Sequence, residues 1–133
     1  LTRYSGNDPL LNYLSGKIYF EQQQYTQSSH FFGKLAAGEN DYREEALYFL
    51  GIISLHHQKN ARIAAGHFQR LIDTAEPDNP FAMKARINLA MLMNESANSV
   101  KAEELLREIE SGPENVVIKV QAENLIEHYN LTK

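Results

Sequence analysis

The side chains best suited to acid–base chemistry or metal binding are five histidines and two adjacent pairs of glutamates. The histidines are His30, His56, His57, His67 and His128. Neighbouring residues of a helix point about 100° apart, so His56 and His57 cannot share a metal ion as a pair spaced by four residues would. Glu44-Glu45 and Glu103-Glu104 diverge in the same way, and we interpret them as solvated surface. We therefore expect no catalytic site and no metal site.

Other chemistries lack the residues that they need. The chain has no cysteine, which removes thiol nucleophiles, disulfides and cysteine-bound zinc. Ser15-Gly16-Lys17 contains the Gly-Lys pair found near the end of a phosphate-binding loop. However, Leu11 stands where that loop requires its first glycine, and the segment falls within a predicted helix. We therefore expect no cofactor.

Composition narrows the class of partner. The 133 residues correspond to one ordinary soluble domain, with 43% hydrophobic and 23% charged residues. The net charge of −4, with both signs mixed along the chain, argues against nucleic acid, which binds basic surfaces. No apolar run approaches the roughly 20 residues of a membrane-spanning helix, so we expect no membrane insertion. The chain begins with Leu1 rather than Met, and we expect it to be part of a longer protein.

The spacing of apolar residues predicts helices along the whole chain and no strand. Asp8-Pro9 is a typical helix start, Gly38 suits a left-handed residue after the second helix, and Asp41 is a candidate cap of the third. The predicted helices cover residues 10–20, 25–37, 42–55, 61–75, 81–94, 99–110 and 114–129. We predict an all-α protein.

A repeated pattern of small and large residues relates these helices to one another. Small residues recur at intervals of 35 and then 39 residues, and a large residue follows each. Two antiparallel helices approach closely where one contributes a small residue and the other fills the gap. The small residues are Gly16, Gly51 and Ala90 on the first helix of each pair and Ser28, Ala64 and Ala102 on the second; the large residues are Phe32, Phe68 and Leu106.

These residues resemble the tetratricopeptide repeat, a helix–turn–helix unit of about 34 residues. The first unit carries the pattern most fully, in Gly16, Tyr19, Tyr25, Ser28 and Phe32. The second has one extra residue in its turn, around residues 58–61. The resemblance implies a right-handed α-solenoid within one domain, residues 1–133. Its repeats would lie at about 9–40, 41–77 and 79–113, followed by a capping helix at about 114–130.

The resemblance also implies a binding surface, because the first helices of such pairs line a concave groove that holds a peptide. The groove-facing residues are Tyr13, Lys17, Phe20, Tyr48, Ile52, Leu55, Lys84, Ile87 and Met91. Most are aromatic or aliphatic, which marks an interaction surface, and the two lysines would orient acidic groups. Alternatively, some of them complete the core or are covered by the N-terminal segment. A subset of the family grips chaperone tails through a carboxylate clamp, of which only Lys84 is present, so we do not expect that partner.

We therefore expect a non-enzymatic interaction module that binds a protein or peptide. One alternative is self-assembly, in which the groove or the ends of the solenoid join copies into a homo-oligomer. Another is an enzyme that uses the groove edge at His56-His57, with His56, the residue at that edge, as a metal ligand. The linker from Glu76 to Pro80 resembles that of bacterial cell-envelope versions of the repeat, which favours the periplasm or envelope over the cytoplasm.

Overall fold

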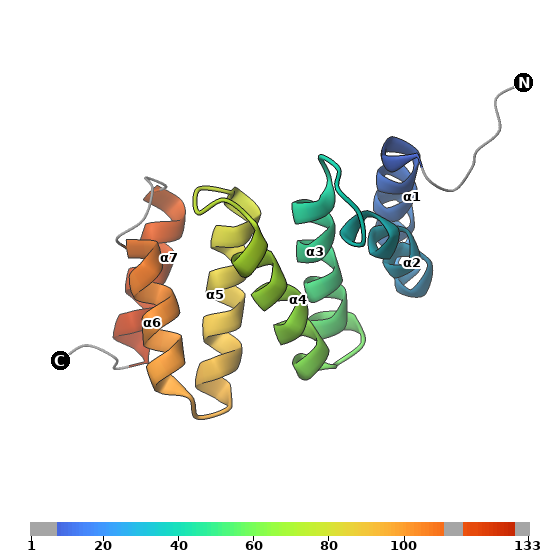
Figure 1. The fold of residues 1–133 in the computed structure, drawn as a ribbon. Coiled ribbons are helices and arrows are strands. Elements are labelled where there is room, and N and C mark those ends of the chain that lie inside the picture. The colour runs from blue at the N-terminus through green and yellow to red at the C-terminus, as the bar shows by residue number, and fades with distance from the viewer. Residues whose placement is uncertain (1–7, 111–115, 130–133) are drawn as a thin grey trace, which may run out of the picture. The chain divides into compact units, whose positions relative to one another are not determined.

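The computed structural model describes residues 8–110 and 116–129, and within these ranges every regular element is a helix and no strand occurs (Figure 1). The α-helices are α1 (Pro9–Glu21), α2 (Tyr25–Ala36), α3 (Arg43–Ile52), α4 (Ala61–Thr74), α5 (Pro80–Glu95), α6 (Ser99–Glu110) and α7 (Val116–His128), and a π-helical segment, η1 (Ile53–His57), follows α3. The all-α prediction is confirmed. The predicted start of the last helix, at residue 114, lies outside the described residues.

The chain, expected as one domain, divides into two compact units, Leu1–His67 and Phe68–Lys133, with the boundary inside α4. In unit 1, α2 packs against both α1 and α3. In unit 2, α6 packs against both α5 and α7, and α5 also contacts α7. Each unit therefore contains a helix pair whose second helix also packs against a third helix.

In unit 1, α1 and α2 pack against each other at the predicted contact of a small residue with a large one. Gly16 of α1 and Phe32 of α2 are both buried. A Cβ atom added at Gly16 would lie 2.9 Å from Phe32 Cε1, so the ring comes this close only because the residue is glycine. The Ser28 hydroxyl donates a buried hydrogen bond of 2.8 Å to the Gly16 carbonyl oxygen. The prediction for this pair is confirmed.

The corresponding residues of the later repeats are buried as well. Ala90, Ala102 and Leu106 are fully buried in the helix pair of unit 2, where α5 packs against α6. The middle set spans the boundary between the units, and its three residues, Gly51, Ala64 and Phe68, are each buried. The repeat pattern therefore identified core residues in both units.

The turns that follow α1, η1 and α5 each contain one non-glycine residue in the left-handed conformation. These residues are Gln23, Lys59 and Ala97, with φ of 62°, 55° and 65°. In the first and third turns, the next residue donates its N–H five residues back, from Gln24 to Tyr19 and from Asn98 to Met93. This Schellman pattern satisfies carbonyl groups at the end of a helix. The backbone therefore repeats along the chain, as the side chains do.

The second repeat has the extra residue that was predicted around residues 58–61, and the structure accommodates it earlier, in η1. Gln58 donates its N–H to the Ile53 carbonyl, and the bond that closes the turn runs from Asn60 to Ser54, six residues back instead of five. A π-helical turn holds one residue more than an α-helical turn. The insertion is therefore absorbed in the last turn of the preceding helix, before the left-handed residue.

Helices α1 and α5 begin with the same kind of N-terminal cap, a side-chain acceptor followed by proline. Asp8 precedes Pro9 and Asn79 precedes Pro80, and each side chain accepts hydrogen bonds from two backbone N–H groups of the first turn. Proline suits this place because its nitrogen has no hydrogen to leave unpaired. The predicted start of α1 is confirmed.

The end of α2 and the start of α3 lie within one residue of their predicted positions, but the roles predicted there for Gly38 and Asp41 are wrong. Gly38 is not in the left-handed region, because the end of α2 is satisfied differently: the Asn40 side chain donates to the Leu35 carbonyl at 3.0 Å. Asp41 does not cap α3. Instead, the Asn40 side chain accepts from the N–H of Tyr42 at 2.9 Å. One asparagine serves both the end of α2 and the start of α3.

The last helix has the polar outer surface expected of a cap. Ile118, Ala122 and Ile126 of α7 are buried. Among residues 118–128 of this helix, the exposed residues are mostly polar, namely Gln121, Glu123, Asn124, Glu127 and His128, together with Val120. A helix of this pattern closes a core on one side and faces solvent on the other.

Gly16→Ala is expected to destabilise the protein by about 1–3 kcal/mol, because the added methyl group collides with the Phe32 ring. Urea unfolding measures the change. Gly33→Ala on α2 is the matched control, since a Cβ atom there meets nothing within 4 Å. Helix propensity should make the control slightly more stable than the parent. Equal stability of the two variants would contradict the close contact.

Ala97→Gly is expected to stabilise the protein by about 0.5–1 kcal/mol, because glycine relieves the cost of a side chain at positive φ. Thermal and urea unfolding both measure this. Ala37→Gly is the control, since Ala37 is exposed and right-handed, so glycine there only adds freedom to the unfolded chain. A loss of stability in both variants would refute the argument.

Candidate functional site

Unit 1 carries a surface between α1 and α3 that contains most of the residues predicted for that unit. We call it the α1–α3 face; its residues are Tyr13, Lys17 and Phe20 of α1 and Glu45, Tyr48, Phe49 and Ile52 of α3, and all are half-buried. On α3, Tyr48 and Phe49 stand three and four residues after Glu45, and Ile52 stands four and three residues after them, so the four residues share one side of that helix. Leu55, also predicted, is half-buried in η1.

An ion pair links the two helices of this face. Lys17 Nζ lies 3.1 Å from Glu45 Oε2, and the side chains are 37% and 18% exposed respectively. The Tyr13 hydroxyl donates to both carboxylate oxygens of Glu45, each at 3.1 Å. The interpretation of Glu45 as solvated surface is therefore wrong: its carboxylate is held by two residues of α1.

The environment of Lys17 balances its charge within the chain. Its ammonium lies 5.3 Å from the centre of the Tyr13 ring and 5.1 Å from that of Phe49, within the range of cation–π attraction. Partial burial alone lowers the pKa of Lys17, but the hydrogen bonds to Glu45 and Tyr13 outweigh it. The pKa is therefore raised above its usual value of 10.5. Lys17 stays charged, and its counter-ion is a residue of the same unit.

Aromatic rings connect this face to the core of unit 1. Phe49 stacks on the fully buried Phe32 with ring centres 4.9 Å apart. Phe20 meets the ring of Phe49 edge-on at 5.0 Å. His57 stacks on Tyr25 at 3.7 Å, and its ring is edge-on to Phe20 at 6.1 Å. The position of each surface ring therefore depends on the packing beneath it.

Tyr13 is restrained from two directions. Its hydroxyl is bonded to Glu45, and its ring stacks on Tyr42 with centres 4.4 Å apart and planes inclined by 17°. The ring of Tyr48 contacts that of Phe49 edge-on at 6.2 Å. Stacked and edge-on pairs of this kind hold rings in defined orientations. The rings of the face therefore each have a neighbouring ring or hydrogen bond that sets their orientation.

The three residues predicted in unit 2 lie on α5 and differ in exposure. Lys84 is exposed, with Nζ 5.6 Å from the centre of the Phe81 ring. Met91 is 38% exposed, whereas Ile87 is only 8% exposed. Ile87 therefore offers little surface to a partner, and Lys84 and Met91 are the accessible predicted residues of this unit.

The five histidines are distributed over α2, η1, α4 and α7. Among residues 8–110 and 116–129, no group of three or more histidine and acidic side chains is placed to hold an ion. The rings of His56 and His57 are 6.5 Å apart and inclined by 71°. The ring of His57 instead stacks on Tyr25, which is a packing role.

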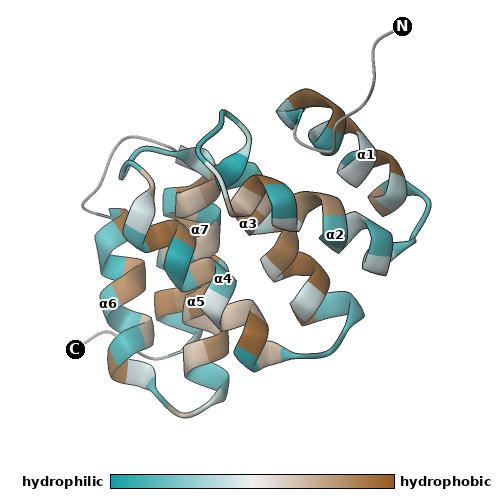
Figure 2. Ribbon diagram, turned by 45° about the vertical axis from the view of Figure 1, so that its right-hand side comes forward, coloured by the Kyte–Doolittle hydropathy of each residue, from teal (hydrophilic) through white to brown (hydrophobic). Residues whose placement is uncertain are grey.

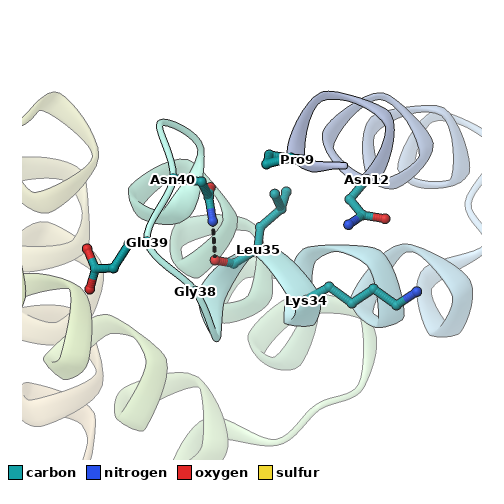
Figure 3. A pocket seen from close by; sticks show the side chains of 7 residues that line it. All are labelled: Pro9, Asn12, Lys34, Leu35, Gly38, Glu39 and Asn40. Carbon is teal, nitrogen blue, oxygen red and sulfur yellow. Dashed lines mark hydrogen bonds between the residues drawn. The ribbon is translucent and has the colours of Figure 1, made fainter. Parts of the chain in front are cut away.

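A cavity of about 220 Å³ opens beside the α1–α2 pair of unit 1 (Figure 3). It is lined by Pro9, Asn12, Lys34, Leu35, Gly38, Glu39 and Asn40. The amide of Asn40 is engaged with the Leu35 carbonyl, and the Lys34 ammonium lies 5.5 Å from the centre of the Phe31 ring. None of the predicted binding residues lines this cavity, so it is separate from the α1–α3 face.

No family model fits the chain, and no curated protein is significantly similar to it. In the part of the chain that the structure describes, no helix has both the length and the apolar character needed to cross a bilayer.

Glu45 and Phe49 belong to the face, yet sequence analysis did not select them. A signal was present, because Glu45 stands three and seven residues before the predicted Tyr48 and Ile52, which is the spacing of one helix side. Because Glu45 was interpreted together with Glu44 as a pair of acids, its place on the same side of the helix as Tyr48 and Ile52 was not recognised. Its partners on α1 follow only from the packing.

Lys17→Met is expected to remove stability in a pH-dependent way. Because the folded-state pKa is raised above 10.5, this contribution is fully present below that pH and is lost as pH rises through the folded-state pKa. Urea unfolding in steps from about pH 8 to about pH 11 should show a constant difference in stability between the parent and the variant up to about pH 10.5, and a smaller difference above it. In a Glu45→Gln background, Lys17→Met should change the free energy of unfolding by less than it does in the parent. A constant difference across the series would contradict the role of the pair.

Proposed function

We propose that the chain is a non-enzymatic protein-interaction module and that the α1–α3 face of unit 1 binds a segment of a partner protein. The observation that carries this proposal is a set of half-exposed aromatic side chains held in fixed positions around a single ion pair. Half-buried aromatic side chains contribute large contact areas to interfaces. Restrained rings also lose little conformational entropy when a partner docks, which favours affinity.

The charge of the face indicates the chemistry of the partner segment. Glu45 balances Lys17, and the other residues of the face, Tyr13, Phe20, Tyr48, Phe49 and Ile52, carry no charge. An apolar or aromatic segment buries this surface without leaving an ion unpaired, whereas an acidic segment has to compete with Glu45 for Lys17. We therefore assign recognition to the rings and Ile52.

For the architecture, the proposal is a right-handed α-solenoid of tetratricopeptide-like helix pairs closed by α7. It is supported by the recurrence of small and large core residues and of left-handed residues at Gln23, Lys59 and Ala97. Repeat proteins of this kind use exposed helix faces to bind other chains.

Replacing Tyr48 and Ile52 together with glutamate should abolish partner binding while leaving helicity intact. Buried charges and lost apolar contacts at the centre of an interface should weaken binding by at least about tenfold. The measurement is recovery of bound proteins from native extract, followed by titration of the recovered partner and circular dichroism of each variant. Val100→Glu is the control, since Val100 is 81% exposed on α6 of unit 2 and is not a residue of the α1–α3 face. Unchanged capture by the double variant would refute the proposal.

A second candidate function, self-assembly, is favoured by a different observation. The outer side of α1 carries four exposed aliphatic residues, Leu10, Leu11, Leu14 and Ile18. Contiguous apolar surface of this kind marks association sites. A mass that rises with concentration would distinguish this candidate from binding of a different protein, which leaves the chain alone monomeric.

A further inference from the structure

Three exposed aliphatic residues form a row along α1. Leu11 is 41% exposed, Leu14 44% and Ile18 55%. They stand three and then four residues apart, so they lie on one side of the helix. We call these three residues the α1 row, and Figure 2 shows the hydrophobic segments of α1 to which they belong. Exposed apolar residues that are contiguous mark a place where another surface packs.

The internal repeat gives each residue of the α1 row an equivalent position on α3. The interval of 35 residues that relates Gly16 to Gly51 relates the row to Ala46, Phe49 and Ile53. Ala46 and Ile53 are fully buried, and Phe49 is half-buried. The same positions are therefore covered in the second repeat and open in the first.

Helix α2 packs on this side of α3. The ring of Phe32 on α2 stacks on that of Phe49, with centres 4.9 Å apart. The two helices run antiparallel, because Tyr25, the first residue of α2, stacks on His57, which lies beyond the end of α3. Among residues 8–110 and 116–129 no helix precedes α1, so its row has no such neighbour. The repeat thus indicates what kind of element covers the row: a single antiparallel helix.

We propose that the α1 row is the docking site of an amphipathic helix of a partner protein, which packs antiparallel to α1 as α2 packs on α3. This surface is distinct from the α1–α3 face, so the inference goes beyond the function proposed above. It also assigns the outer side of α1 to a different protein rather than to a second copy. The reason is that the equivalent place on α3 holds a helix like α2, not another first helix of a pair.

The residues of the row define what the partner helix presents. Leu14 is equivalent to Phe49, which meets the ring of Phe32, so an aromatic side chain is expected opposite Leu14. Leu11 is equivalent to Ala46 but is larger, so a small residue is expected opposite Leu11, because packed helices match large side chains with gaps. The partner helix therefore combines an aromatic residue with a nearby glycine or alanine.

Charge at the two ends of the row favours a helix whose last turn is basic. Asp8 stands three residues before Leu11, and Glu21 three residues after Ile18. Neither carboxylate forms an ion pair with the described part of the chain. An antiparallel partner places the positive end of its helix dipole near Glu21 and its last turn near Asp8, where a lysine or arginine fits. Helix α2 has such a residue, Lys34, in its own last turn.

The geometry is tested by giving α1 a neighbour like α2 within the full chain. A second copy of residues 8–42 is inserted directly before Asp8, which reproduces the 35-residue interval of the repeat. Because the chain has no cysteine, Leu14→Cys in the copy that leads into α3 reports the exposure of the row by its rate of thiol labelling. The rate should fall at least about tenfold relative to Leu14→Cys in the parent chain. Val100→Cys, on α6, should react equally fast in both chains.

Docking of a separate helix is tested with an acetylated and amidated peptide of residues 24–38, whose only formal charge is that of Lys34. Isolated helices of this length are only partly formed, so the titration into isotopically labelled full chain extends to about 2 mM. The NMR shift changes should concentrate on the α1 row. Leu14→Glu in the chain, or Phe32→Ala in the peptide, should weaken binding at least about tenfold. Val100→Glu should bind like the parent, and circular dichroism confirms that each variant is folded.

The possible results separate this site from the other candidates. Slow labelling in the duplicated chain and peptide binding that Leu14→Glu weakens support the proposal. Unchanged labelling, or no shift changes on α1, overturns it. A mass of the chain alone that rises with concentration, and that Leu14→Glu abolishes, assigns the row to a second copy and also overturns it. Replacing Tyr48 and Ile52 with glutamate should leave peptide binding unchanged, so this site and the α1–α3 face can fail independently.

Discussion

The contact between the backbone of Gly16 and the ring of Phe32 is the constraint on which the rest of unit 1 depends. Without a side chain at Gly16, α1 and α2 approach closely enough for the Ser28 hydroxyl to reach the Gly16 carbonyl. Phe32 then presents its ring to Phe49 of α3 at 4.9 Å. A single position without a Cβ atom therefore governs how α1, α2 and α3 pack, because close-packed interiors transmit such differences in volume.

The α1–α3 face is the outer end of the same series of contacts. Phe49 rests on Phe32, and Phe20 and the Lys17 ammonium in turn pack against Phe49. Glu45 completes the arrangement by accepting from Tyr13 and Lys17. The surface is therefore positioned by the core, which explains how half-exposed aromatic residues keep fixed orientations. Its charge is internally balanced, and this is why we assign recognition to the rings rather than to the lysine.

The turns show how one repeat tolerates a change in length. Gln23, Lys59 and Ala97 adopt the same left-handed conformation even though none is glycine. The backbone hydrogen bonds around each turn impose this conformation despite its cost. In the second turn an extra residue is accommodated by η1, so that the left-handed residue keeps its place. The left-handed conformation of the turn thus recurs along the chain, while the length of the preceding helix varies.

The helical class, the order of the helices, the cap at Asp8 and the contact of Gly16 with Phe32 could all be predicted from the sequence. They depend on periodicity and on residues close together along the chain. The salt bridge and hydrogen bonds of Glu45 could not, because its partners Tyr13 and Lys17 are 32 and 28 residues away. The near-complete burial of Ile87 and the exposure of Leu14 likewise depend on which neighbouring helices are present. Local sequence determined which helices form, and only tertiary packing decided which of their charges are paired and which of their apolar sides remain open.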